Sequence, residues 1–540
     1  MANNAKKQSF LGGAAILASA VAIVKLVGAV YRIPVNNLLS AEGKTYFKVA
    51  YDIFNVLMTV STAGLPLAIS KLTSRAHATG RENEKRKLFR TSIWLFLGIG
   101  LAGSLLMFFG ASQLADLQRQ PMAAPAIRAL APTILCVSLL ACMRGYTQGQ
   151  GNMTPTAVSQ VIEVTFKLGV GLPLAWYLIR VVQKGVAYGA AGAILGVTVS
   201  EIIALGFMAL YLFRHRDNPA LSDDVPPSSS ALMKQVLHIG IPITLSNSAM
   251  SLLTMLDTTI VLRRLADIEN QLPSAPSVLF GQYGYGTDLV NLPPSFVFPV
   301  TMSLIPFVAA ALARHEHQRA NRVVSSALRL IALLAIPAGV GLSVLSGPIL
   351  LLLYPAQVQD AIACAPLLRV QGVACIFICL MNLTNAILQS YGKEKIPIYT
   401  MVAGGVTKIA MNYVLVGTPS INIMGAPIST LCCYLVIAGF NLYFVWKYSP
   451  EKPRYLQIFA KPAIASVAMG LSAWAAHGLL SRLLAGPGSG YLAGAAATLG
   501  AIAVAVVVYG ILVLALRILR AEDLESVPHG KKLAKILRLK

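Results

Sequence analysis

Long apolar stretches, each separated from the next by a few polar residues, recur along the whole 540-residue chain. Most of them are close to the roughly 20 residues that an α-helix needs to cross the hydrocarbon core of a bilayer. The pattern therefore predicts an all-α polytopic membrane protein with fourteen transmembrane helices. The predicted spans are 10–33, 46–70, 89–112, 122–146, 155–179, 186–213, 232–262, 284–312, 323–353, 359–390, 395–416, 422–447, 456–481 and 490–518.

The short connections between these spans fall into a basic set and a less basic set. Loops such as 71–90, 214–234 and 447–461, together with both ends of the chain, hold roughly 28 Lys and Arg residues, whereas the alternate loops hold roughly 9. Because short basic loops stay on the cytoplasmic side, we expect both termini to be cytoplasmic. The first apolar run continues past Lys25 without a clear cleavage site, so we expect a retained helix.

Composition agrees with a membrane protein and excludes several soluble classes. The chain is 56% hydrophobic and only 12% charged, whereas soluble domains carry about 25% charged residues. The formal net charge of +23 lies mostly in short loops, so we expect membrane lipids and not nucleic acid as partners. No loop is long enough for a nucleotide-binding domain. We therefore expect no cofactor, and transport driven by a coupling ion or the membrane potential.

Two weak internal echoes relate the halves of the chain. The hairpin at 142–169 has a counterpart 241 positions later, in which Lys408 corresponds to Lys167. A second echo, "AYDIFN" against "GTDLVN", pairs Asp52 with Asp288. Both map one block of six helices onto the other, which predicts parallel repeats. We expect an N-lobe at 1–225, a C-lobe at 226–450, and two further helices with a basic tail at 451–540.

Three segments carry a resemblance to a known family: "RGYTQGQGNMTPTAVSQVIE", "STAGLPLAISKL" and "ILRAEDLESVPHGKKL". They resemble the multidrug/oligosaccharidyl-lipid/polysaccharide (MOP) exporter superfamily, most closely its branch of stage V sporulation protein B and MurJ-type lipid II flippases. The resemblance implies two six-helix lobes in a V around a cavity, plus two terminal helices. It also implies a monomeric flippase of the bacterial cytoplasmic membrane. Such a flippase moves a polyprenyl-diphosphate-linked saccharide, above all lipid II, by alternating access, for the growing cell wall or for sporulation.

Basic side chains inside predicted helices are candidate substrate-binding groups, because an intramembrane charge needs a partner or a wet cavity. Lys167 and Lys408 fall near mid-helix at matching places in the two halves. Lys25 and Arg32 lie two turns apart on the first helix, and the resemblance implies that such residues bind the substrate diphosphate. An ammonium or guanidinium group can compensate its concentrated charge. Glu163, one turn before Lys167, leaves open a self-neutralising pair instead.

Three carboxylates, Asp52, Asp257 and Asp288, fall toward the predicted outer ends of their helices. They could form gate ion pairs with cations of the first helix, bind a coupling proton or cation, or simply lie at a wet helix end. Asn55 and Asn291, one turn further in, could bind sugar hydroxyl groups or bridge helices. No catalytic residue or metal-ligand set is predicted.

Three alternatives to a lipid II flippase stay open. An ion-coupled multidrug (MATE-like) exporter would favour acidic over basic cavity residues, and an exporter of another lipid-linked polysaccharide unit would share the same motifs. A membrane glycosyltransferase would need a carboxylate on an external loop. Glu42 is the sole acid of the predicted first external loop. We therefore expect a transporter and not an enzyme.

Overall fold

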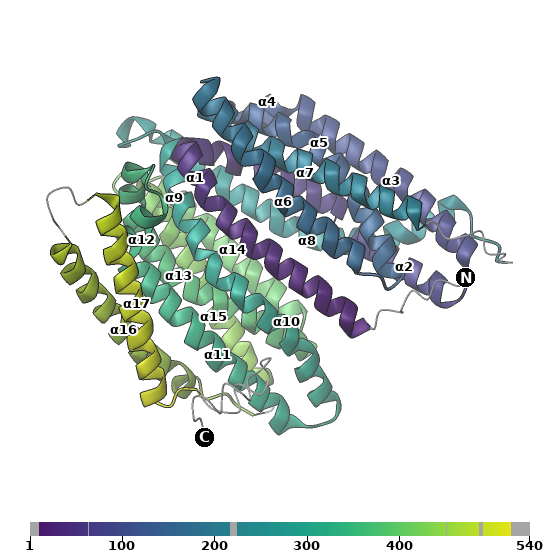
Figure 1. Cartoon of the computed structure of the whole chain (residues 1–540). Helices are drawn as coiled ribbons and strands as arrows, with labels where there is room; N and C mark the ends of the chain where they lie inside the picture. Colours follow the sequence, from purple (N-terminus) through teal and green to yellow (C-terminus); the bar gives the residue numbers. More distant parts are fainter. Residues whose placement is uncertain (1–9, 63, 216–223, 450, 485–489, 520–540) are drawn as a thin grey trace. The chain divides into compact units, whose positions relative to one another are not determined.

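The computed structural model describes residues 10–62, 64–215, 224–449, 451–484 and 490–519, apart from some side chains of α1, α8 and α10. All long regular elements in these ranges are helices (Figure 1). Their bounds are α1 Phe10–Thr62, α2 Leu65–Ala78, α3 Glu82–Phe109, α4 Ala111–Leu117, α5 Ala124–Gly149, α6 Thr154–Trp176, α7 Val186–Arg214, α8 Ser229–Asp267, α9 Pro276–Val290, α10 Leu292–Ala313, α11 His317–Val344, α12 Ser346–Leu353, α13 Val358–Ser390, α14 Lys395–Val416, α15 Gly425–Tyr448, α16 Tyr455–Leu483 and α17 Tyr491–Ala515.

The chain forms two compact units. Unit 1 comprises Met1–Ala266 with Pro276–Gly281, and unit 2 comprises Asp267–Ala275 with Gln282–Lys540. Helix α8 therefore groups with unit 1, although the repeat assigns it to the predicted C-lobe at 226–450. Because those lobes are defined by internal similarity and the units by packing, the division after residue 225 stays a prediction.

The all-helical prediction is confirmed, and the protein is a multi-pass membrane protein. Within the described residues, nine helices are long and apolar enough to span a bilayer. The predicted span 395–416 coincides with α14. Large apolar side chains such as Trp94, Phe109 and Phe213 are about 70% exposed, as lipid-facing groups are. The total of fourteen spans and the two-lobe arrangement remain predictions.

Two helix boundaries differ from the predictions. The predicted external loop between residues 33 and 46 is helical, because α1 continues to Thr62 with one break, at Ser40 (φ 60°, ψ 175°). Val35 and Leu39 are buried there, so packing stabilises the segment as a helix although it contains several polar residues. The predicted span 46–70 is in turn divided before α2. A Cβ on Gly64 would lie 2.1 Å from the Gly240 carbonyl oxygen.

A corresponding break divides the predicted span 284–312. Helix α9 ends at Val290 and α10 begins at Leu292, with proline in its first turn. Proline fits there because it lacks the N–H that a first helical turn leaves unpaired. The two spans that the internal echo relates are thus both broken.

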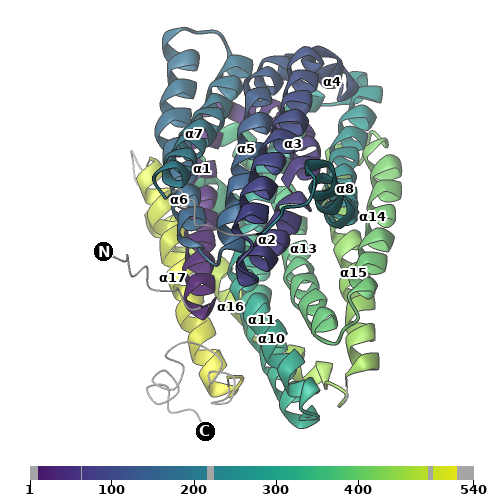
Figure 2. The ribbon, with the colours of Figure 1, turned by 90° about the vertical axis from the view of Figure 1, so that its right-hand side faces the viewer.

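The last two helices of unit 2 pack side by side (Figures 1 and 2). Small residues line their contact: Ala473 of α16 packs in one cluster with Ala501 and Ala505 of α17. The cluster includes Leu345, and the Tyr509 hydroxyl donates to the Leu333 carbonyl oxygen at 2.9 Å. Close backbone approach of this kind is typical of membrane helix pairs.

Candidate functional site

A lysine ammonium group lies between two tyrosine rings in unit 1. Lys167 of α6 donates a hydrogen bond from Nζ to the Tyr51 hydroxyl of α1 at 3.0 Å. The same Nζ is 5.2 Å from the ring centroid of Tyr31 and 5.3 Å from that of Tyr51. Aromatic faces stabilise a cation electrostatically without neutralising it. The two direct contacts of the Lys167 ammonium group are therefore with neutral tyrosines and not with a carboxylate.

Other charges lie near this ammonium group. Lys167 interacts electrostatically with Arg32 of α1, which carries an exposed side chain, and with Glu201 of α7 and Glu163. The Oε2 atom of Glu201 is buried and accepts no hydrogen bond from the described residues. Helices α1, α6 and α7 thus bring two cations and two carboxyl groups together. Of the three predicted substrate-binding cations whose side chains the structure describes, Arg32 and Lys167 interact electrostatically with each other.

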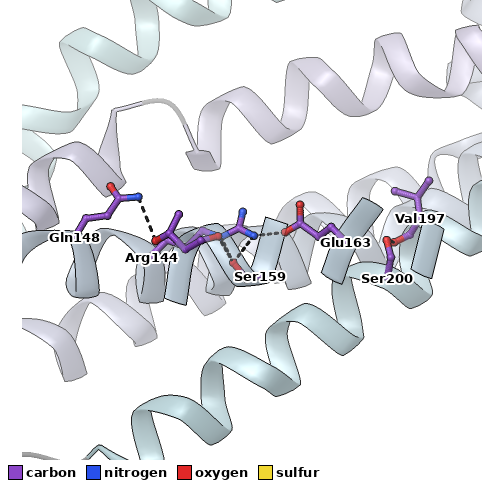
Figure 3. Close-up of polar contacts among 7 residues, drawn as sticks. Arg144, Gln148, Ser159, Glu163, Val197 and Ser200 are labelled. Atoms are coloured by element: carbon purple, nitrogen blue, oxygen red, sulfur yellow. Dashed lines mark hydrogen bonds and ion pairs between the residues drawn. The ribbon is translucent and has the colours of Figure 1, made fainter. Parts of the chain in front are cut away.

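The carboxylate of Glu163 pairs with an arginine. Arg144 of α5 forms an ion pair with Glu163 of α6 (Figure 3). Its Nε and Nη2 atoms also donate to the Ser159 hydroxyl, at 2.9 and 2.8 Å. The direct partner of Glu163 is therefore Arg144 of the neighbouring helix and not Lys167, so the alternative of a direct Glu163–Lys167 pair is not what the structure shows.

The hairpin between α5 and α6 fixes this arrangement. Gly151 has a positive φ of 80°, which an L side chain rarely adopts, and Pro155 lies in the first turn of α6. Gly145 approaches α2 so closely that a Cβ would lie 2.7 Å from the Pro66 carbonyl oxygen. Arg144, beside this contact, is held where its side chain reaches Ser159.

A second polar group joins α1 to α8. Asp52 is 3% exposed, and Lys48 donates to its Oδ1 and Oδ2 atoms at 2.5 Å each. The Thr258 hydroxyl donates to Oδ2 at 2.6 Å. Asp52 is thus paired within its own helix. Sequence reasoning missed Lys48, although its spacing of four residues from Asp52 is typical of a helical ion pair.

The remaining candidates are distributed over both units. The side chain of Lys25 lies outside the described residues. In unit 1, Asp257 of α8 and Asn55 of α1 are half-buried, and the Asn55 carbonyl accepts from Thr59 at 2.6 Å. The members in unit 2 are Lys408 on α14 and Asp288 on α9, both half-buried, and the exposed Asn291.

Two further observations concern metal ligands and the carboxylate of Glu42. No three His, Cys, Asp or Glu side chains gather as metal ligands in the part of the chain that the structure describes. Glu42 accepts a hydrogen bond from the Tyr46 hydroxyl at 2.5 Å. That contact ties the carboxylate of Glu42 to its own helix.

Comparison with known families assigns the chain. A family model described as "Polysaccharide biosynthesis protein" matches residues 10–312, and a MatE model matches residues 242–414. The chain belongs to the polysaccharide biosynthesis protein family. This family membership, together with the relatives and solved structures below, places it in the MOP exporter superfamily. It is a transporter of that superfamily and not an enzyme.

Three relatives of this polysaccharide biosynthesis family member come from Bacillus subtilis. An uncharacterized membrane protein, YabM, is 28% identical over 97% of this chain and 96% of its own. Lipid II flippase MurJ is 23% identical over 86% of this chain and 88% of its own. Stage V sporulation protein B is 23% identical over 97% and 98%.

Solved structures support the same fold. Lipid II flippase MurJ in an inward closed conformation matches with a TM-score of 0.68 at 15% identity, covering 93% of this chain and 98% of that chain. A multidrug resistance MATE family transporter in an inward-facing conformation matches with a TM-score of 0.65 at 15% identity, covering 79% and 98%. The family member thus has the helical fold shared by flippases and drug exporters.

Proposed function

We propose that this transporter moves a polyprenyl-diphosphate-linked saccharide, foremost the peptidoglycan precursor lipid II, from the inner to the outer leaflet of the bacterial cytoplasmic membrane. The observation that carries the proposal is the pair Arg32 and Lys167. These two basic residues interact electrostatically within unit 1, and the Lys167 ammonium group lies between two neutral tyrosines. A diphosphate bound beside them relieves their mutual repulsion. Similarity to MurJ and stage V sporulation protein B supports this substrate class.

The terminal helices support the choice of a lipid-linked substrate. An apolar cavity of about 520 Å³ is lined by α12, α16 and α17, including Leu351, Leu352 and Tyr491. We assign it to part of the isoprenoid tail. The remaining elements of the proposal are fourteen spans in two six-helix lobes with both termini cytoplasmic, and a monomer that works by alternating access. The predicted coupling ion or membrane potential supplies the energy.

An ion-coupled multidrug exporter is the second candidate, and the MatE match to residues 242–414 favours it. Drug cations require acidic groups that are available to bind them. Asp52 already receives Lys48 and Thr258, which weighs against its use as a drug-binding carboxylate. We therefore rank the flippase first, and an exporter of a different lipid-linked saccharide remains the closest variant of it.

Complementation tests the proposal in cells. In a strain depleted of its own lipid II flippases, expression of this chain is expected to restore growth and lipid II translocation, and the double variant Arg32→Ala/Lys167→Ala is expected to fail. Membrane levels of both proteins are measured in parallel. Failure of the wild-type chain at normal membrane levels contradicts lipid II as substrate, and dye resistance in its place supports the drug exporter.

A further inference from the structure

A basic cavity lies in unit 2, apart from the candidate site. It has a volume of about 890 Å³ and is bordered by the first turns of α11, the segment between α15 and α16, the start of α16 and the end of α17. Its lining contains six cationic residues and, among the residues described, one carboxylate, Glu451. The six are Arg322, Arg329, Lys452, Arg454, Lys461 and Arg517.

Three of these cations have no partner of their own in the described chain. No hydrogen bond or ion pair joins the guanidinium groups of Arg322, Arg454 and Arg517 to another described residue, and all three are exposed. Lys461, by contrast, donates to the Leu516 carbonyl at the end of α17 at 3.1 Å. Lys452 donates to the Trp446 carbonyl at 3.0 Å. Backbone contacts thus hold the two lysines, whereas the guanidinium groups of the three arginines remain available to bind an anion.

The backbone adds to the attraction for negative charge. Helices α11 and α16 both begin at this cavity, with Gln318 and Arg454 among its lining residues. The N-terminus of a helix carries a partial positive charge. Asn321 donates from Nδ2 to Glu451 at 3.0 Å and so engages the single acid of the lining, while its buried Oδ1 has no described partner. That oxygen can accept a hydrogen bond from a hydroxyl group of a ligand.

We propose that this cavity binds the headgroup of an anionic phospholipid. Arginine forks match phosphate oxygens bidentately, and basic cavities between membrane helices are suited to phospholipid headgroups. The source of the phosphate is inferred from an apolar side chain beside the cations. Leu456 of the lining is 82% exposed, and such an apolar surface suits a ligand with acyl chains better than a free phosphate. The cavity lies at the end of unit 2 that the basic loops assign to the inner leaflet.

Native mass spectrometry of the full-length protein in detergent tests the proposal, with phosphatidylglycerol and phosphatidylcholine as probes. Phosphatidylglycerol is expected to bind the wild-type protein more tightly than phosphatidylcholine. The triple variant Arg322→Gln/Arg454→Gln/Arg517→Gln is expected to lose on the order of tenfold or more in phosphatidylglycerol affinity. The triple variant Lys71→Gln/Arg75→Gln/Arg90→Gln, which removes the same charge from exposed positions of unit 1, is expected to bind as wild type.

A third variant keeps the test valid if the glutamines destabilise the fold. Replacing the same three arginines with lysine retains the charge and removes the bidentate geometry, and a smaller loss of affinity than with glutamine is expected. Equal losses in the cavity and control variants contradict the site. Equal binding of phosphatidylcholine, or preferential capture of undecaprenyl diphosphate by these three arginines, contradicts a phospholipid. Because the readout is lipid binding, it is independent of whether the protein flips lipid II.

Discussion

The ammonium group of Lys167 is held by neutral partners. Tyr51 accepts its hydrogen bond, and the rings of Tyr31 and Tyr51 flank it. A carboxylate in the same place would cancel the charge, whereas tyrosines leave it able to attract an anion. Glu163, which could have neutralised Lys167 from one turn away, is engaged by Arg144. The ion pair of Arg144 and Glu163 therefore has a structural role, whereas the Lys167 ammonium group remains available to bind an anion.

Replacing Lys167 tests this separation. Lys167→Ala is expected to weaken binding of undecaprenyl diphosphate by about tenfold to a hundredfold, because a hydrogen bond to a charged group contributes about 1.5–3 kcal/mol. Lys167→Arg keeps the charge and is expected to retain most of the affinity. Titration of the purified variants, with thermal unfolding as a check on folding, measures both. Unchanged affinity in Lys167→Ala contradicts the role given to this residue.

The pair of Arg144 and Glu163 has the opposite role. Arg144→Gln leaves Glu163 without its partner and is expected to destabilise the protein by about 3 kcal/mol. The double variant Arg144→Gln/Glu163→Gln is expected to be less destabilised than the sum of the single variants. Arg128→Gln is the matched control, since Arg128 is exposed and donates a hydrogen bond to the Ser112 hydroxyl and not to a carboxylate. Additive effects on thermal unfolding in detergent would falsify the coupling.

Part of this site could be predicted from the sequence. The mid-helix position of Lys167 identifies it as a candidate, because a charge there needs compensation. Its tyrosine partners lie 116 and 136 positions earlier in the chain, on α1. Such partners depend on how α1 packs against α6, which no local pattern specifies. The Lys48–Asp52 pair could have been predicted from the sequence, because residues four positions apart are neighbours on a helix.

At the scale of the helices, hydropathy predicts where spans lie but not where they break. The predicted spans follow from apolar composition, which is local. The break at Gly64 arises where α2 approaches Gly240 of α8, and the break at Ser40 lies between buried segments of α1. Both breaks depend on tertiary contacts, so they cannot be predicted from the local pattern of apolar residues.

The contact of α6 with α7 makes a prediction at this scale. A Cβ on Gly196 would lie 2.3 Å from the Gly171 Cα atom, whereas a Cβ on Gly206, in the same helix, would meet nothing within 4 Å. Gly196→Ala is expected to push the helices apart and destabilise the protein by about 1–3 kcal/mol. Gly206→Ala is expected to be close to neutral. Thermal unfolding compares the two, and equal midpoints contradict close packing at Gly196.

At the scale of the whole molecule, the family and the helical architecture follow from the sequence, whereas the packing units do not. Helix α8 joins unit 1 through contacts along its length: Gly64 donates to the Thr244 hydroxyl at 3.2 Å, and Thr258 donates to Asp52. These contacts link residues about 180 to 206 positions apart. The internal echoes compare short stretches of sequence and carry no information on such long-range packing.

Topology gives a prediction for the complete chain. The fourteen predicted spans put both termini on the same side of the membrane, and the basic loops predict that this side is the cytoplasm. A fluorescent protein fused after Lys540 is therefore expected to fold and fluoresce, and alkaline phosphatase at the same position is expected to be inactive. The same pair of reporters placed at residue 184, in a predicted external loop, serves as the control with the opposite pattern. Active phosphatase at the C-terminus contradicts the predicted cytoplasmic location of that end.

Translocation by the purified protein tests the central proposal most directly. Proteoliposomes containing the wild-type chain and fluorescent lipid II are assayed for lipid II that becomes accessible in the opposite leaflet. The wild type is expected to accelerate this step well above protein-free vesicles, and Arg32→Ala/Lys167→Ala is expected to fall to the level of those vesicles. Lipid II that remains in its original leaflet with folded wild-type protein, at several membrane potentials and ion gradients, contradicts the proposed function.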